Sequence, residues 1–130
     1  MGITELSKQD LIDYRIAKAY EVYGEALDVS TLHHWNLAVN RLYYSIFHIS
    51  SALLLSEGNI AKTHKGIIQI LMKDYVRTGK LTKEEGQLIS SLFNMRHTGD
   101  YDDLFDYGES DITPLISPTK LLLDKLRSFI

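Results

Sequence analysis

The stretch AVNRLYYSIFHISSALLL, residues 38–55, constrains the fold of this chain more than any other. It predicts a long helix that is apolar around most of its circumference. Its apolar seam advances by four and three residues in turn, a spacing typical of helical bundles. The seam consists of Trp35, Val39, Leu42, Ile46, Ile49 and Leu53. We expect a helix this apolar to lie at the centre of a bundle.

The same helix carries one polar column, made of Arg41, Tyr44, Ser45 and His48. At about 100° per residue, this column lies roughly a third of a turn from the apolar seam. Charged groups on a central helix must meet a partner, a cleft or another subunit. The alternative is that Arg41 and His48 are satisfied structural groups at the edge of the core.

The 130 residues predict a single domain, 1–130, that is large enough to bury its own core. The absence of cysteine excludes disulfides, thiolate zinc sites and cysteine nucleophiles, and it fits a reducing compartment. The N-terminus lacks the apolar run of a signal peptide, and the LLL triplets are too short to span a membrane. We therefore expect a soluble, cytoplasmic protein that does not enter a membrane.

Charge and histidine spacing limit the ligands that the chain can take. Fourteen Lys and Arg against seventeen Asp and Glu give a formal charge of −3, whereas non-specific duplex binders are usually basic. Any contact with RNA or a nucleotide should therefore be local. The five histidines form no HExxH pair, and the acidic segment after residue 99 lacks an EF-hand pattern. We expect no metal and no cofactor.

Two late prolines and no alternating strand pattern favour an all-α fold. We predict a four- or five-helix up-and-down bundle. The helices should span roughly 8–27, 31–58, 63–79 and 82–99, with a fifth from Pro114 or Pro118 to the end. Ser7, Thr63 and Thr82 are the expected N-caps, the last in a capping box with Glu85.

The segment 100–111 (DYDDLFDYGESD) is acidic and aromatic. We expect a loop or a frayed helix end there, held in place by burial of its apolar side chains. These side chains are Tyr101, Leu104, Phe105 and Tyr107.

Two short segments could bind an anion. After the fourth helix, Arg96 either pairs with Asp100 one turn later or clamps a phosphate, with His97, Asp100 or Tyr101 polarising a hydroxyl or water. At the start of the third helix, Lys62, His64 and Lys65 are basic where acidic residues are usual. They are either solvated surface or one side of an anion site.

Three sequence segments together resemble the HEPN domain superfamily, in particular its small single-domain prokaryotic branch. Residues 40–48 (NRLYYSIFH) are similar to that branch's AxxRxYYAxFH signature. His64-Lys65-Gly66 and Arg96-x-x-x-Asp100-Tyr101 follow in the same order and spacing. The resemblance covers nearly the whole chain.

The resemblance implies a helical bundle that commonly forms a homodimer, with a polar cleft at the subunit interface. Many HEPN proteins are metal-independent endoribonucleases with an Arg-x4–6-His motif, and many are toxins paired with a minimal nucleotidyltransferase antitoxin. In this chain Arg96 matches the arginine of that motif. The positions open to the histidine hold Tyr101, Asp102 and Asp103, so the general base does not carry over.

Three hypotheses remain open for the function. In the first, the chain is a non-catalytic or weakly catalytic RNA- or nucleotide-binding HEPN domain, of the toxin type that pairs with a nucleotidyltransferase, and any catalysis would involve Arg96, Asp100 and Tyr101. Its substrate-binding side chains would be Arg41, Tyr44, His48, His64 and Lys65. In the second, the protein is a ribonuclease that combines Arg96 with His48 or His64 from another helix or subunit. In the third, it is a helical dimerisation or interaction module without catalysis.

Overall fold

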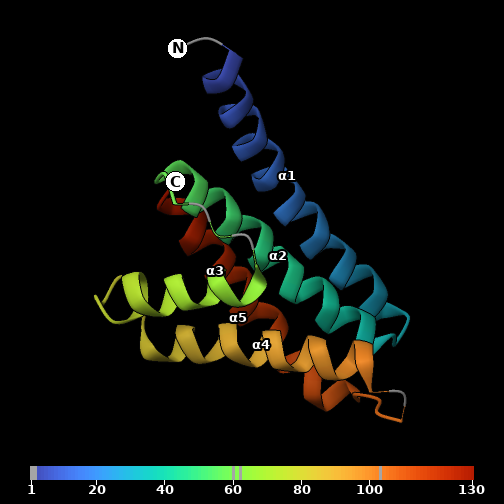
Figure 1. Cartoon of the computed structure of the whole chain (residues 1–130). Coiled ribbons are helices and arrows are strands. Elements are labelled where there is room, and N and C mark those ends of the chain that lie inside the picture. The colour runs from blue at the N-terminus through green and yellow to red at the C-terminus, as the bar shows by residue number, and fades with distance from the viewer. Residues whose placement is uncertain (1–2, 60, 62, 103) are drawn as a thin grey trace.

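Helix α2 (Trp35–Ser56) lies at the centre of the bundle and contacts α1, α3, α4 and α5 (Figure 1). Its predicted seam lies in the core of the protein, because Val39, Leu42, Ile46, Ile49 and Leu53 are all at most 2% exposed. Trp35 packs half-buried against the same core. The predicted all-α fold is confirmed, since the described residues contain no strand.

The computed structural model describes residues 3–59, 61, 63–102 and 104–130. Besides α2, its helices are α1 (Ile3–Thr31), α3 (His64–Leu71), α4 (Lys83–Tyr101) and α5 (Glu109–Ser128). Helices α1 and α2 run antiparallel, as do α3 and α4, and the N-terminal part of α1 projects beyond the bundle (Figure 1). Within the described ranges, no helix meets the length and apolarity that a membrane span needs.

Two of the three predicted N-caps are confirmed. The Thr63 hydroxyl accepts a hydrogen bond from the Gly66 amide at 2.9 Å, and α3 begins at the next residue. Thr82 and Glu85 form the expected capping box, with each side chain accepting from the other's amide. The Ser7 prediction is wrong, because α1 already begins at Ile3 and therefore includes Ser7.

The predicted start of the fifth helix is also wrong. Helix α5 begins at Glu109, where the Gly108 amide donates to the Asp111 carboxylate at 2.9 Å. Pro114 and Pro118 lie inside the helix and not in its first turn. Both prolines are exposed and one turn apart, so the backbone carbonyls that they leave unpaired are on the solvent side.

The predicted third helix is divided in two. Helix α3 ends at Leu71, and a π-helical segment, η1 (Met72–Val76), continues it. Gly86 of α4 is buried against this segment. A Cβ atom there would lie 3.0 Å from Val76 Cγ2 and 3.3 Å from Met72 Sδ, so any larger residue would force these two side chains to shift.

The sequence predicted that burial of apolar side chains holds the loop between α4 and α5, and this prediction is wrong for most of them. Tyr107 is half-buried, but Tyr101, Leu104 and Phe105 are 67%, 99% and 38% exposed. Asn36 of α2 instead binds the loop backbone, accepting from the Tyr107 amide at 2.8 Å and donating to the Phe105 carbonyl at 3.1 Å. Hydrogen bonds between the Asn36 side chain and the loop backbone therefore fix this loop, and they leave Tyr101, Leu104 and Phe105 facing solvent.

Two buried tyrosines give a matched test of packing in this core. The Tyr75 hydroxyl is buried and finds no hydrogen-bond partner among the described residues, whereas the Tyr23 hydroxyl donates to the Ile116 carbonyl at 3.1 Å. Tyr75→Phe should therefore raise the free energy of unfolding by up to about 1 kcal/mol, and Tyr23→Phe should lower it by about 1 kcal/mol. Urea unfolding of both variants measures this. Equal losses in the two variants would contradict the expectation.

Candidate functional site

Arg96 of α4 is a charged residue buried against α2, with 7% of its surface exposed. Its guanidinium carbon lies 5.0 Å from the Tyr43 ring centroid, 5.6 Å from that of Tyr44 and 5.8 Å from that of Phe93. Cation–π attraction to these three rings stabilises the charge in a desolvated position.

Part of the hydrogen-bonding capacity of Arg96 is unused. Its Nη1 lies 3.9 Å from the Asp100 Oδ2, which is an ion pair too long for a hydrogen bond. Its Nε is buried and has no hydrogen-bond partner among the described residues. Most buried polar groups in proteins are hydrogen-bonded, so this guanidinium can still accept an anion. The expected Arg96–Asp100 approach thus exists but does not saturate the arginine.

A chain of polar contacts joins Arg96 to the polar column of α2. Asp100 Oδ2 accepts a hydrogen bond from the side-chain Nδ2 of Asn40 at 2.9 Å, and Asn40 Oδ1 accepts from Arg41 Nε and Nη2 at 3.0 and 2.6 Å. Arg41 also pairs with Glu25 of α1 at 3.1 Å. This chain links α1, α2 and α4.

Tyr44 lies between the two arginines. The Arg41 guanidinium carbon is 5.4 Å from its ring centroid, and that of Arg96 is 5.6 Å away. The structure therefore brings the predicted residues Arg41, Tyr44, Arg96 and Asp100 into one cluster. Ser45 differs from the predicted column, because it is fully buried and its hydroxyl donates to the Leu42 carbonyl.

His64, the first residue of α3, extends this cluster. Its ring stacks on Phe47 with centroids 4.1 Å apart, and its Nδ1 lies 2.7 Å from the Tyr43 hydroxyl. Burial, with a smaller effect of the Arg96 charge, lowers the pKa of His64. Burial also raises the pKa of Tyr43 to about 12, so the phenol keeps its proton and His64 stays neutral at pH 7.

His48 is neutral for a similar reason. Burial lowers the pKa of His48 to about 4, and the Arg15 guanidinium adds to the effect. Arg15 of α1 donates to His48 Nδ1 at 2.8 Å, which leaves the ring proton on Nε2. The ring centroid of His48 is 6.2 Å from that of Tyr44, so this histidine borders the same cluster.

The other predicted site residues that the structure describes lie apart from the cluster. Lys65 is exposed, and Lys62 lies outside the described residues, as does Asp103. Tyr101 packs against exposed His97 with ring centroids 4.9 Å apart, and it is 67% exposed. Asp102 is exposed at the C-terminal cap of α4.

Sequence reasoning missed four residues that complete the cluster: Arg15, Glu25, Asn40 and Phe93. Of these, Arg15 carried a usable signal, because it lies beside the apolar seam positions Ile12 and Ile16 of the first helix. A cation beside a seam is placed to meet the neighbouring helix. The other three acquire their contacts only through the packing of α1 and α4 on α2.

Comparison with known proteins identifies relatives over nearly the full chain. The family model described as "HEPN domain" matches residues 12–129. A UPF0332 protein of Thermotoga maritima is 32% identical over 123 residues, which cover 95% of this chain and 93% of that protein. "Putative toxin MJ0142" of Methanocaldococcus jannaschii is 27% identical over 130 residues, all of this chain and 88% of that protein. A UPF0332 protein of Archaeoglobus fulgidus is 22% identical over 121 residues, 93% of this chain and 96% of that protein.

Proposed function

The chain belongs to the HEPN domain family, and we propose that it binds RNA or a nucleotide through a phosphate at Arg96. The observation that carries this proposal is the buried Arg96 guanidinium, whose Nε has no partner among the described residues. Its paired carboxylate oxygen, Asp100 Oδ2, lies 3.9 Å from Nη1. Arginine binds phosphate oxygens in a bidentate manner, and a phosphate would supply the missing acceptors.

The surroundings of Arg96 suit single-stranded RNA. Aromatic rings and guanidinium planes are the surfaces on which unstacked bases pack. The partly exposed rings of Tyr44 and Phe93 flank Arg96, and Arg41 adds a second cation at Tyr44, whereas the Tyr43 ring beside Arg96 is buried. With a net charge of −3, the protein depends on this local site and not on a basic surface.

Arg96→Met should weaken binding of a fluorescein-labelled single-stranded RNA at least about tenfold, since a charge-assisted phosphate contact is lost. The magnitude of the slope of log K for RNA binding against log salt concentration should fall by about one. Fluorescence anisotropy in EDTA, at several salt concentrations, measures both. Arg77→Met, which removes an exposed arginine beyond η1, is the matched control and should bind as the unmodified protein does.

The free energy of unfolding of Arg96→Met decides how this result is interpreted. Methionine keeps the packing against the aromatic rings and removes a buried cation, so we expect a change within about 1 kcal/mol. Unaltered RNA affinity in a folded Arg96→Met variant would refute the proposal. If no RNA or nucleotide binds at low salt, an interaction module becomes the better account.

A metal-independent endoribonuclease is the second candidate function. It is favoured by the meeting of His64 and Arg96 on the rings of Tyr43 and Tyr44, which brings a histidine to the arginine from another helix. A neutral imidazole can exchange a proton with the 2′-hydroxyl or the leaving oxygen. RNA cleavage in EDTA that disappears in both Arg96→Met and His64→Gln would favour this candidate over binding alone.

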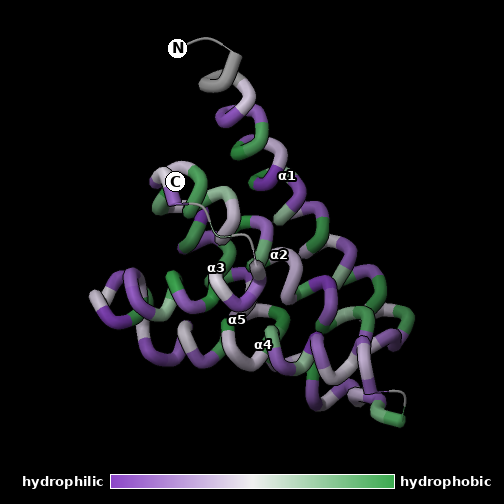
Figure 2. The backbone as a smooth tube through the Cα atoms, in the orientation of Figure 1, coloured by the Kyte–Doolittle hydropathy of each residue, from purple (hydrophilic) through white to green (hydrophobic). Residues whose placement is uncertain are grey.

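Partner proteins complete the proposal. Two relatives carry the word toxin in their names, which supports a toxin-type protein held by an antitoxin, with a nucleotidyltransferase as the proposed partner. The projecting end of α1 mixes hydrophilic and hydrophobic residues (Figure 2) and exposes Tyr14 by 57%. We infer that a second copy of the chain covers part of this helix in a homodimer.

A further inference from the structure

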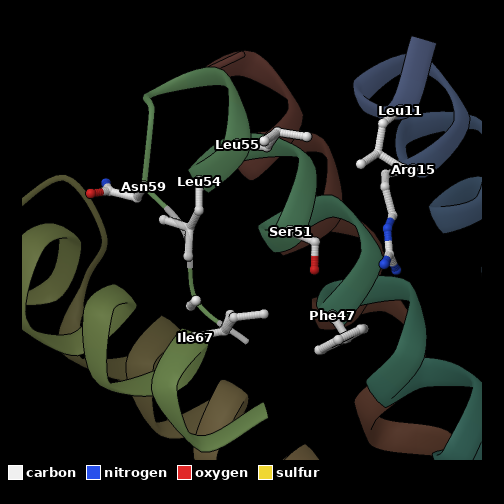
Figure 3. Close-up of a pocket in the computed structure, with 9 residues that line it drawn as sticks. Leu11, Arg15, Phe47, Ser51, Leu54, Leu55, Asn59 and Ile67 are labelled. Carbon is white, nitrogen blue, oxygen red and sulfur yellow. The ribbon is translucent and has the colours of Figure 1, made fainter. Parts of the chain in front are cut away.

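A pocket of about 200 Å³ lies between α1, α2 and α3 (Figure 3). Its apolar side is formed by Phe47, Leu54 and Ile67, and Ser51 and Asn59 add a hydroxyl and an amide to the lining. Phe47 belongs to the pocket and to the cluster at once, since its ring also stacks on His64. The pocket and the cluster around Arg96 therefore share the Phe47 side chain.

Arg15 gives this pocket an uncompensated positive charge. Its side chain faces the pocket from α1, near Ser51 and Phe47 (Figure 3), with the guanidinium carbon 5.7 Å from the Phe47 ring centroid. The ion pairs among the described side chains include none with Arg15. The Arg15 guanidinium donates a hydrogen bond to Nδ1 of His48, which is neutral and does not balance the charge. A guanidinium at the edge of an apolar pocket calls for a ligand that joins a flat apolar body to an anion.

We propose that this pocket holds one nucleobase whose phosphate is bound by Arg15. The proposal rests on the RNA or nucleotide binding proposed above and adds a separate base subsite to it. The base belongs to a nucleotide within RNA or to a free mononucleotide, and the two sources share the same recognition chemistry.

The size and lining of the pocket favour a single aromatic ring system. An apolar cavity of about 150 Å³ holds one benzene molecule, whereas pockets for drug-sized ligands start at about 300 Å³. The Ser51 hydroxyl and the Asn59 amide both donate and accept hydrogen bonds, as recognition of a base edge requires. An aliphatic acid would use Arg15 and the apolar side but leave these two groups unpaired.

The first test compares RNA with an oligonucleotide of the same length that lacks its bases. Ser51→Leu fills the pocket without touching Arg96. It should weaken RNA binding about tenfold, because base stacking in the pocket is lost, and leave the affinity for the abasic strand unchanged. Ser56→Leu, at an exposed position near the end of the same helix, is the matched control. Equal RNA affinity in Ser51→Leu and the unmodified protein would overturn the base subsite while leaving the proposed function intact.

The second test does not depend on RNA binding. In protein labelled at Ile and Leu methyls, titration with AMP or UMP should shift the NMR signals of Leu54 and Ile67, and ribose 5-phosphate or inorganic phosphate should not. Shifts with hexanoate but not with nucleotides would overturn the proposal, as would shifts that follow only protein concentration, which indicate a second copy. Absence of nucleotide-induced shifts at these methyls would overturn it as well.

Discussion

Lowering the pH from 7 to 4 should destabilise the fold through His48 by up to about 3 kcal/mol. Burial lowers the pKa of His48 from 6.5 to about 4, and Arg15, Lys18, Arg41 and His64 add repulsion from α1, α2 and α3. Each pKa unit corresponds to about 1.4 kcal/mol. The unfolded chain takes up the proton below about pH 6.5 but the native state only near pH 4, so stability falls across that window.

His48→Asn should remove most of this loss. The Asn side-chain oxygen can replace Nδ1 as the acceptor of the Arg15 hydrogen bond, and it does not titrate. We expect the variant to be less stable than the unmodified protein at pH 7, because the contacts with Phe47 and Tyr44 are lost. The two stability curves should converge or cross by pH 4. Urea unfolding at half-unit steps of pH measures the difference.

Carboxylates also titrate in this window, so the comparison between variants carries the prediction. His33→Asn controls for loss of an imidazole, since His33 is exposed and its φ of 61° is a conformation that asparagine tolerates. If His48→Asn lost stability as steeply as the unmodified protein between pH 6.5 and 4, the charge on His48 would not be coupled to folding.

Much of the fold could be predicted because local signals agree with the packing. The seam of α2 is regular enough to identify a central helix, and the caps at Thr63 and Thr82 are local hydrogen bonds. The start of α5 could not be predicted in the same way. Its cap is Gly108, which has no side-chain acceptor, and the two prolines suggested a later start than the one that Asp111 stabilises.

The candidate site could be predicted only in part, because its contacts join distant segments. Arg96 and Asp100 are one helical turn apart, so their approach follows from sequence spacing. Asn40 meets Asp100 across 60 positions, and Arg15 meets His48 across 33. Such contacts depend on how α1 and α4 cross α2, which no local pattern specifies. Tyr101 shows the converse, because it adjoins Asp100 in sequence yet faces solvent beside His97.

Asn36→Ala should release the loop between α4 and α5 and lower the free energy of unfolding by about 1–3 kcal/mol. The Asn36 amide joins three segments: it accepts from the Tyr107 amide at 2.8 Å and donates to the Phe105 carbonyl at 3.1 Å, near the Gly99 carbonyl and the Asp106 carboxylate. Each of these exposed or partly buried hydrogen bonds contributes about 0.5–1.5 kcal/mol. Amide exchange at Tyr107 should therefore accelerate.

Chymotrypsin gives a second measure of this release, because Tyr101, Leu104 and Phe105 are already exposed and lack only a mobile backbone to be cut. Cleavage in this segment should accelerate at least about tenfold in Asn36→Ala. Asn94→Ala, at an exposed position of α4, is the control and should be cut at the original rate. Unchanged cleavage in Asn36→Ala would mean that other contacts hold the loop. A released loop would also free the last turn of α4, where Asp100 contacts Asn40. We therefore expect the RNA affinity of Asn36→Ala to fall together with its resistance to chymotrypsin.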